Sequence, residues 1–584
     1  MLNFVKSVWW LVKKHWYRYF FVIFFSILLP FVNLLPATII SRFTAGIIDG
    51  KINRDFLIFE ILIPYVLTMA ALYIVSTCRR LSQNRLTTTV YRELQVKYME
   101  NILAQDATFF ERFQSGDLLS RALGDIATVK FSAGNRLINI FYESLVVCVT
   151  FIAMLFIHPV LAISCFLPLT CILIANIFLR AKVKKNWKHV REKHAELSNV
   201  VLESITNVRT IRAFSKEEEN YNKNLEYSQK AYDVELANLK INVIFQPLFQ
   251  SIVAISTIIC YGLSAYFHYL DPVLFTIPML IQFIYYLNLF QSPLTNIGNL
   301  LNNFYQSLIS ADRLNEVYNA KSIVLDHIDA RPLENVKKIE FKNFSFRYYG
   351  EDYDVLKNIN LTITYGKTIG IVGHTGSGKS TLVKQLVRQM PICEGTLFIN
   401  GEPIESFHQQ TVRSRVGYVP QEHMLFSRTV ERNVAFGMIG SSDEEVQAAI
   451  ALADFTKDIQ NLPYGLDTVV GEYGVTLSGG QKQRLSIARA FIKDADVLVL
   501  DDSLSAVDGK TEANIISTLK KYRSKKTNII VAHRLSAVMH ADEIIVLDEG
   551  RIVERGTHDE LMNLKGWYYE QFISQQMNNS KEGE

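Results

Sequence analysis

Long stretches of this 584-residue sequence lack Asp, Glu, Lys and Arg altogether, which excludes an ordinary soluble protein. Each is close to or longer than the roughly 20 residues that an α-helix needs to cross a bilayer. The uncharged runs are residues 19–41, 61–78, 144–179, 241–270 and 273–311. His158-Pro159 divides the third run, so the sequence predicts six membrane-spanning helices. Their predicted positions are about 19–41, 56–78, 137–157, 159–179, 241–267 and 273–295.

Cysteine is also scarce. The sequence contains only 6 cysteines, and none of them has the paired spacing of a metal-binding site. Most fall within predicted spans, where cysteine serves as a small apolar packing residue. The net charge of +4 gives no indication of nucleic-acid binding, since it comes largely from basic residues on one side of the membrane.

The distribution of Lys and Arg predicts the orientation of the chain. Residues 1–18, 79–136 and 180–240 carry 4, 9 and 13 of these residues, whereas the opposite side has only Arg42, Lys51 and Arg54. Basic loops face the cytoplasm. We therefore expect a multi-pass protein of the cytoplasmic (inner) membrane, with its N-terminus, both long loops and its C-terminal half in the cytoplasm.

The composition and hydrophobic pattern of the sequence change along its length. The two long basic loops are rich in helix-forming residues and predict helical hairpins, with tips near Phe113–Asp117 and Asn207–Ser215. From Lys337 onward, alternating apolar residues and an Asn400-Gly401 hairpin signal indicate strands mixed with helices. The predicted organisation is an interfacial elbow helix (1–17), an all-α transmembrane domain with six spans and long cytoplasmic extensions (18–311), a linker (312–335), an α/β P-loop domain (336–575) and a flexible tail (576–584).

The strongest motif is TIGIVGHTGSGKST at residues 368–381, which contains G-x-x-x-x-G-K-S between an apolar strand and a helix. Its glycines let backbone N–H groups turn inward around phosphate oxygens, and the helix N-terminus favours an anion. Lys379 supplies a cation for the phosphates and Ser380 a hydroxyl for Mg²⁺. The predicted nucleotide-binding residues in this motif are Gly373, His374, Thr375, Gly376, Ser377, Gly378, Lys379, Ser380 and Thr381.

Two further motifs follow. VTLSGGQKQRLSIARA places Ser478, Gly479 and Gly480 at a helix start, which offers a second anion site. VLVLDD reads as a buried strand that ends in Asp501 and Asp502. The first carboxylate is suited to hold Mg²⁺, and the second to polarise an attacking water, although a Glu would reach about one carbon further than Asp502.

With these motifs the chain closely resembles a half-transporter of the ATP-binding cassette (ABC) exporter family. LSGGQ resembles the family signature, which faces the ATP held by a partner chain, and VLVLDD resembles its Walker B strand. The resemblance covers nearly the whole chain and implies an ATPase coupled to transport, with ATP and Mg²⁺ as cofactors. The signature residues are Leu477, Ser478, Gly479, Gly480 and Gln481.

The resemblance also assigns roles to single residues. Tyr348 matches the aromatic residue that stacks on adenine, with Tyr349 as a rival one position away, and Glu472 matches a residue near the coupling interface. The hairpin tips match the helices that rest on the cassettes. The remaining matches are Gln421 (contact to Mg²⁺, together with Ser380 and Asp501), His533 (switch histidine) and Ser505 to Asp508 (D-loop between two cassettes).

Asp502 departs from the family pattern, in which Walker B ends in Asp-Glu and the Glu is the general base. A base withdrawn by about 1.5 Å predicts poor hydrolysis at this chain's own site, because placement errors near 1 Å cost about 100-fold. An intact signature beside such a base resembles one half of a bacterial heterodimeric multidrug exporter. The implied partner is a second half-transporter with a catalytic Glu and an altered signature.

In the membrane domain, Gln282, Tyr286 and Phe290, with Tyr285 nearby, recur at helical spacing. They either line a cavity for drugs or serve helix packing. Glu143 lies near the cytoplasmic end of the third predicted span. It either binds cationic drugs or pairs with Arg136 in a water-filled inner mouth.

Three functions follow from these patterns. The first is ATP-driven export of amphipathic or cationic drugs across the lipid membrane, by a heterodimer with one catalytic and one degenerate ATP site. The second is a homodimeric lipid or peptide exporter in which Asp502 is a slow but sufficient base. The third, of another class, is an ATP-binding sensor or gated regulator that does not pump.

Overall fold

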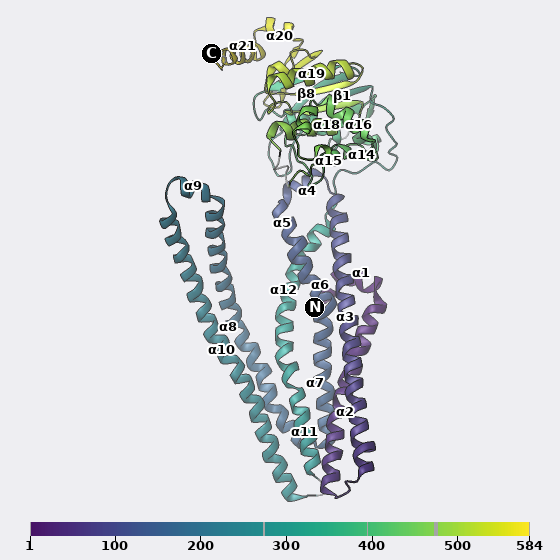
Figure 1. The fold of residues 1–584 in the computed structure, drawn as a ribbon, viewed down its shortest axis with the longest axis vertical. Helices are drawn as coiled ribbons and strands as arrows, with labels where there is room; N and C mark the ends of the chain where they lie inside the picture. The colour runs from purple at the N-terminus through teal and green to yellow at the C-terminus, as the bar shows by residue number, and fades with distance from the viewer. Residues whose placement is uncertain (1, 273–274, 394, 472–476, 583–584) are drawn as a thin grey trace. The chain divides into compact units, whose positions relative to one another are not determined.

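The computed structural model describes residues 2–272, 275–393, 395–471 and 477–582, and these form two compact units. One unit comprises residues 1–102 and 116–319 and is built of helices (Figure 1). The other comprises residues 103–115 and 320–584 and contains two sheets.

Helices over four of the predicted spans extend beyond them, whereas the helix at 137–157 has the predicted bounds and the helix within 273–295 is shorter than predicted. Among the described residues, three stretches are long and apolar enough to cross a membrane: Trp16–Ile48, Phe56–Leu103 and Ser115–Ile157. The helices are α1 (Leu2–Lys14), α2 (Trp16–Ile48), η1 (Phe56–Leu62), α3 (Ile63–Leu103), α5 (Ser115–Ser120), η2 (Arg121–Asp125), α6 (Ile126–Phe131), η3 (Ser132–Arg136), α7 (Leu137–Ile157), α8 (Pro159–Thr206), α9 (Val208–Ala213), α10 (Glu217–Leu270), α11 (Ile277–Leu289) and α12 (Gln291–Asn319).

The helical structure is interrupted between α7 and α8 at His158-Pro159, where the sequence predicts the boundary between two spans. His158 has an extended backbone, and its Nδ1 accepts a hydrogen bond from the Leu161 N–H at 3.2 Å. Pro159 occupies the first helical position, where its missing N–H leaves no hydrogen bond unmade. The local sequence therefore ends one helix and starts the next.

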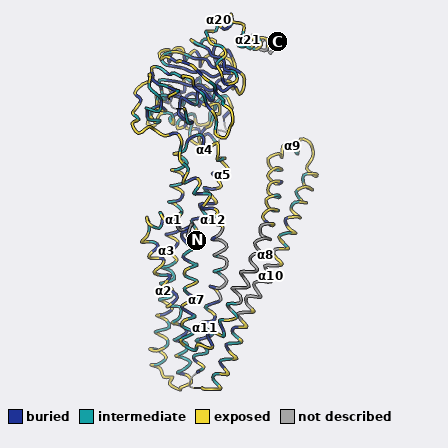
Figure 2. Tube along the Cα trace, turned by 180° about the vertical axis from the view of Figure 1, so that it is seen from behind, coloured by how far each residue is buried: buried dark blue, intermediate teal, exposed yellow. Residues whose placement is uncertain are grey.

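Helices α8 and α10 run side by side as a hairpin, with the short helix α9 at its tip (Figure 1; Figure 2). Apolar side chains remain exposed along this hairpin, among them Leu202, Ile205 and Phe214, each at least 63% exposed. An apolar surface of this kind is typical of an interface.

The polar connector begins later than the sequence indicates, because α12 continues to Asn319 rather than ending before residue 312. Ion pairs hold its last turns to the first hairpin: Arg313 contacts Asp117 at 2.6 Å, and Arg121 contacts Glu316 at 2.8 Å. These partners are distant in sequence, so a local polar composition could not reveal them.

The second unit has a four-stranded sheet in the order β2-β1-β4-β5 and a six-stranded sheet in the order β10-β9-β3-β8-β7-β6. The central strands β3, β7 and β8 of the larger sheet are almost entirely buried. The strands are β1 (Lys338–Phe346), β2 (Leu356–Thr364), β3 (Thr368–Gly373), β4 (Leu397–Ile399), β5 (Glu402–Pro403), β6 (Val416–Val419), β7 (Val497–Asp501), β8 (Thr527–Val531), β9 (Glu543–Asp548) and β10 (Arg551–Gly556).

Short helices cover these sheets. They are α13 (Lys379–Lys384), η4 (Gln385–Val387), η5 (Ile404–Ser406), α14 (Gln409–Arg415), α15 (Val430–Ala435), α16 (Asp443–Leu452), α17 (Thr456–Gln460), η6 (Gly465–Asp467), α18 (Gly479–Phe491), α19 (Gly509–Tyr522), η8 (Leu535–Ala537), α20 (His558–Leu564) and α21 (Trp567–Glu582). The predicted Asn400-Gly401 hairpin is confirmed: both residues have positive φ, at 56° and 89°, between the antiparallel strands β4 and β5.

The topology of the larger sheet determines where a site forms. β6, β7, β8, β3 and β9 are parallel to one another, while β10 at the edge is antiparallel to β9. The carboxyl ends of these parallel strands therefore share one edge of the sheet, which is where open α/β sheets bind ligands.

The second unit also contains α4 (Ala107–Arg112), which ends directly before the predicted tip of the first hairpin at Phe113–Asp117. The Ala107 N–H donates to the Gln389 carbonyl oxygen at 2.9 Å. The Asp106 carboxylate caps α4 and also accepts hydrogen bonds from Ser322 and from the Ile323 N–H. Burial raises the pKa of Asp106, but the hydrogen bonds from Thr108 and Ser322 outweigh it and hold the pKa below its usual value.

Candidate nucleotide-binding site

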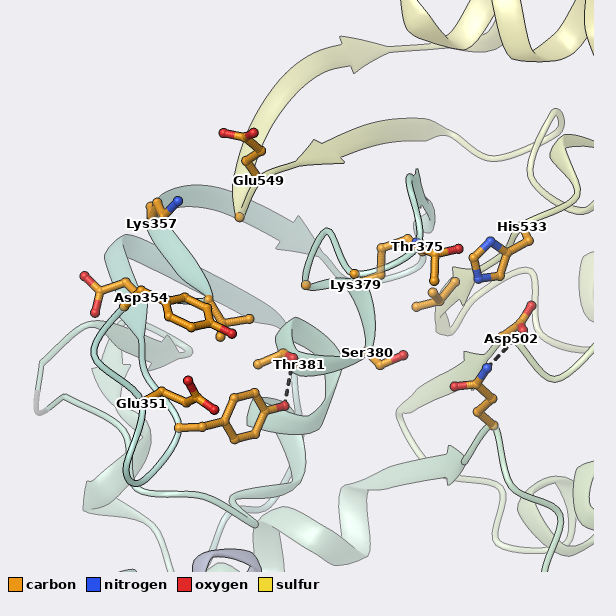
Figure 3. Close-up of a pocket in the computed structure, with 18 residues that line it drawn as sticks. Glu351, Asp354, Lys357, Thr375, Lys379, Ser380, Thr381, Asp502, His533 and Glu549 are labelled. Atoms are coloured by element: carbon orange, nitrogen blue, oxygen red, sulfur yellow. Dashed lines mark hydrogen bonds between the residues drawn. The ribbon is translucent and has the colours of Figure 1, made fainter. Parts of the chain in front are cut away.

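A cavity of about 820 Å³ opens at the carboxyl edge of the larger sheet. Figure 3 shows Lys379 and Ser380 in its middle, Glu351 and Asp354 at one end, and Asp502 and His533 at the other. It is lined by Tyr348, Glu351, Tyr353, Asp354, Val355, Lys357, Thr375, Gly376, Gly378, Lys379, Ser380, Thr381, Gln421, Asp502, Val531, His533, Glu549 and Gly550.

The loop between β3 and α13 forms the floor of the cavity. Gly373 (φ 145°) and Gly378 (φ 97°) adopt backbone conformations that residues with a side chain rarely take. A Cβ on Gly373 would also collide with the Leu547 carbonyl oxygen. This turn leads directly into the N-terminus of α13, so the loop can hold an anionic phosphate chain.

Lys379 is buried beneath this loop. Its ammonium donates hydrogen bonds to the carbonyl oxygens of Gly373, at 2.9 Å, and His374, at 2.7 Å. Burial lowers the pKa of Lys379 below its usual value, with the nearby Asp502 and Asp501 acting in the opposite direction. A buried cation held only by neutral carbonyls is a ready partner for phosphate oxygens.

Asp501 ends β7 and is fully buried. Its two oxygens accept from the Ser380 hydroxyl at 2.7 Å and from the Tyr418 hydroxyl at 2.8 Å. Burial, together with the Asp501 carboxylate, raises the pKa of Tyr418, so that this hydroxyl stays a donor. A carboxylate and a hydroxyl held together are a donor set that fits Mg²⁺.

Asp502, the next residue, has a left-handed backbone conformation with φ at 48°. Its carboxylate lies 3.5 Å from the Gln421 amide nitrogen, a long contact that Figure 3 marks with a dashed line. Burial raises the pKa of Asp502, and the charge of Asp501 adds to this, while His533 and Lys379 oppose it. The structure thus brings Asp502, Gln421 and His533 together at the end of the cavity, from three different strand ends.

Tyr348 and Tyr349 differ clearly in their surroundings. The Tyr348 hydroxyl contacts the Thr381 hydroxyl at 2.9 Å, and its ring packs edge-on against Phe346. Tyr349 is 60% exposed, does not line the cavity and lies under the guanidinium of Arg112 at 5.3 Å. Only the first of these two rings therefore faces the cavity.

The signature segment starts helix α18. Ser478 is its N-cap: the Ser478 hydroxyl accepts from the Gln481 N–H, and the Gln481 side chain accepts from the Ser478 N–H at 2.9 Å. Leu477 is buried. Among the described residues, a Cβ on Gly479 would meet nothing within 4 Å, so this glycine leaves open space beside it. Glu472 lies outside the described residues.

The predicted D-loop joins the signature helix to the Walker B strand. The Ala506 N–H donates to the Gln483 side-chain oxygen at 3.1 Å, and the Ser505 hydroxyl donates to the Asp502 carbonyl at 3.0 Å. Asp508 caps α19 through the Lys510 and Thr511 N–H groups. These two hydrogen bonds connect the segment after Asp502 to helix α18.

The predicted drug-cavity residues of the membrane domain separate into two groups. Tyr286 and Phe290 are buried in an apolar cluster, and the Gln282 amide donates to the Tyr286 hydroxyl at 3.0 Å, which favours the packing alternative for these side chains. Tyr285 is only partly buried beside them. Glu143 accepts a hydrogen bond from Asn296 at 3.0 Å.

Tyr353 was not identified from the sequence as a site residue, although it lines the cavity and is 61% exposed. The only available signal is its position, five residues after Tyr348 in the same loop. The acidic residues Glu351, Asp354 and Glu549 also line the cavity and carry no motif.

Comparisons with known proteins agree with this architecture. Residues 19–294 match the ABC transporter transmembrane region, and residues 356–505 match the ABC transporter family. The fold is similar to a solved structure of a bacterial Atm1-family ABC exporter with ATP bound (TM-score 0.79, 25% identity, 97% of this chain and 98% of that chain).

Full-length relatives carry transporter names. YheI of Bacillus subtilis, a probable multidrug resistance ABC transporter ATP-binding/permease protein, is 37% identical over 100% of this chain and 99% of its own length. The multidrug resistance-like ATP-binding protein MdlA of Escherichia coli is 30% identical over 97% of this chain and 96% of its own. An ATP-dependent lipid A-core flippase of Syntrophus aciditrophicus is 31% identical over 82% of this chain and 79% of its own.

The chain belongs to the ABC transporter family. It is an ABC exporter with a helical membrane domain and an ATP-binding domain, and its ATPase activity is coupled to transport across the membrane.

Proposed function

We propose that this chain is one half of a heterodimeric drug exporter in which its own ATP site mainly binds nucleotide and a partner-supplied site hydrolyses it. The observation that carries the proposal is Asp502 at the position of the base, in a chain with an intact Leu477–Gln481 signature. The names of YheI and MdlA support multidrug substrates.

The binding role of this chain's own site rests on the cavity. In the proposed site, Lys379 and the loop amides hold the phosphates, while Ser380, Asp501 and Gln421 hold Mg²⁺, which neutralises phosphate charge. Thr375, Gly376, Ser377 and Thr381 complete the loop around the phosphates. Asp502 and His533 face the reacting end of the cavity, but the short Asp502 side chain orients water poorly.

The proposed two-chain assembly is supported by the surface of the α8–α10 hairpin. The hairpin exposes Leu202, Ile205 and Phe214 on segments that we place in the cytoplasm, where lipid cannot cover them. A partner chain that packs on the hairpin would bury this apolar surface. The excess of Lys and Arg in residues 79–136 and 180–240 supports the cytoplasmic placement.

Transport by the co-expressed pair in vesicles tests the proposal. We expect ATP-dependent accumulation of a cationic amphipathic dye only when this chain and its partner are both present. Equal transport by this chain alone would replace the heterodimer with a homodimer. The name of the flippase relative suggests a second candidate activity, so ATP-dependent translocation of fluorescent lipid without dye transport would favour lipid export. Passive flux gated by nucleotide would indicate a regulator.

We expect Tyr348 to stack on adenine. Tyr348→Ala should weaken nucleotide binding to this chain by about 1–3 kcal/mol, that is about 5- to 150-fold in Kd, by analogy with base–aromatic stacking. Tyr348→Phe, which keeps the ring and removes only the Thr381 contact, should bind nearly as well as the wild type. Binding of a fluorescent ATP analogue measures the effect.

Tyr349→Ala is the matched control for this prediction, and we expect little change because its ring lies against Arg112 outside the cavity. Tyr353→Ala tests the additional aromatic residue of the cavity wall. A larger loss from Tyr349→Ala or Tyr353→Ala than from Tyr348→Ala would assign the stacking position to that other residue.

A further inference from the structure

The C-terminal helix α21 contacts two loops of the nucleotide site. Its first turn is built into the domain: Tyr568 is fully buried, and its hydroxyl bonds to the His558 Nδ1 at 2.8 Å. The Glu554 carboxylate accepts from the Trp567 and Tyr568 N–H groups and so caps the helix. This anchoring gives the helix a fixed start.

Trp567 connects α21 to the phosphate loop. Its indole N–H donates to His374 Nε2 at 2.7 Å, and the two rings pack edge-on with centroids 5.2 Å apart. His374 is also the residue whose carbonyl accepts from Lys379. The indole therefore holds one end of the loop that holds the lysine.

Gln575 connects the same helix to the switch-histidine loop. Its side-chain oxygen accepts from the Leu535 N–H at 2.9 Å, and its amide donates to the His533 carbonyl at 2.9 Å. Both hydrogen bonds fix the backbone around His533, whose side chain lines the cavity. Trp567 and Gln575 are eight residues apart, which is roughly 12 Å along a helix.

We propose that α21 is a strut that sets the spacing between the phosphate loop and the switch-histidine loop, with Trp567 and Gln575 as positioning residues for the ATP site of this chain. Neither is among the described residues that line the cavity, so both act through His374 and His533 rather than on nucleotide. The inference rests on the proposed nucleotide site and adds to it a control of ATP affinity by the C-terminal helix.

Photolabelling with 8-azido-ATP, resolved chain by chain in the co-expressed complex, tests this inference. Trp567→Phe keeps the aromatic ring and loses the N–H, and we expect about 3- to 10-fold weaker labelling of this chain, the size of one hydrogen bond. Gln575→Glu keeps the acceptor for Leu535 but turns a carboxylate toward the His533 carbonyl, so we expect a loss of at least the same size. Gln576→Glu, the same change on the exposed neighbouring residue, should label as the wild type does.

Two readouts separate positioning from general stability. In a His374→Leu background, Trp567→Phe should have no further effect on labelling, because the hydrogen bond is already lost. The part of the tryptophan fluorescence that is lost in Trp567→Phe belongs to Trp567; it should change on adding Mg·ATP in the wild-type complex, and the change should be reduced in His374→Leu, which keeps Trp567 but removes its hydrogen bond.

Wild-type labelling by both Trp567→Phe and Gln575→Glu would overturn the strut, as would an equal loss in Gln576→Glu or a Trp567→Phe effect that persists without His374. If the wild-type chain itself takes no label, the proposed nucleotide site fails and the inference fails with it, which is a separate result from a labelled wild type with unaffected variants.

Discussion

Lys379→Met is expected to weaken Mg·ATP binding at this chain's own site by about 30-fold or more. Removing one partner of a buried, hydrogen-bonded charge pair costs about 2 kcal/mol or more. Without nucleotide, the Lys379 ammonium is held by two neutral carbonyl oxygens and burial lowers its pKa, so the protein keeps this charge buried at a cost. In the proposed site, the phosphates of ATP would supply the opposite charges that compensate for it.

The folded domain should tolerate this substitution. Methionine fills a similar space without a charge, and replacing a buried charge by an apolar side chain is often neutral or stabilising. We therefore expect a melting temperature near that of the wild type in the absence of ATP, and a much smaller rise when ATP is added.

Lys384→Met, at the other end of α13 and outside the cavity lining, is the matched control and should bind ATP as the wild type does. Chain-resolved photolabelling and the ATP-dependent melting shift measure the difference. Labelling of Lys379→Met at the wild-type concentration dependence would show that the lysine does not hold phosphate.

The sequence predicts the core of this site because its parts are local motifs. The phosphate loop and the signature are each contained in one strand–turn–helix or turn–helix segment, so spacing alone places Lys379 beside Ser380 and Ser478 at a helix start. The parallel order of the strands then follows from the alternation of strands and helices, and it brings Asp501, Gln421 and His533 to one edge.

The remaining features depend on contacts between distant residues. Trp567 and His374 are 193 positions apart, and Arg112 reaches Tyr349 from another part of the chain. No local pattern encodes such pairs. The same reason explains the late end of α12, since its last turns are fixed by ion pairs with residues of the first hairpin rather than by their own composition.

In the membrane domain, helical spacing alone left two functions open for Tyr286 and Phe290. Aromatic residues repeating along one helix face are equally suited to a cavity and to a packed interface. Their burial in an apolar cluster favours packing, a distinction that only the neighbouring helices provide.

Gly479→Ala is expected to reduce the ATPase activity of the assembled pair by about 100-fold or more, while Asp502→Asn leaves it little changed. In the proposed assembly, the signature of this chain grips the γ-phosphate of the ATP that the partner hydrolyses, and losing one oriented contact to a transition state costs about 10²–10³ in rate. In that proposed assembly, Asp502 belongs to the site that mainly binds nucleotide.

Gly479 is the sharper position for this test than its neighbours. Ser478→Ala would also remove the cap of α18, at a cost of about 1 kcal/mol, and a Cβ on Gly480 would press on the Ala506 carbonyl oxygen at 3.1 Å. A methyl group on Gly479 meets nothing within 4 Å among the described residues, so in the proposed assembly we attribute a loss of activity to the contact with the partner's nucleotide. Gly124→Ala, the same change into similarly open space in the helical unit, is the control.

Asp502→Glu completes the comparison. It restores the missing methylene, and a second hydrolysing site would appear as a higher steady-state ATPase activity of the co-expressed complex if the left-handed backbone at position 502 lets the longer carboxylate reach the water. The decisive contrast is between Asp502→Asn and Gly479→Ala. If Asp502→Asn stops turnover as completely as Gly479→Ala does, Asp502 is a working general base, and the chain is better described as a subunit with two hydrolysing sites, such as a homodimer.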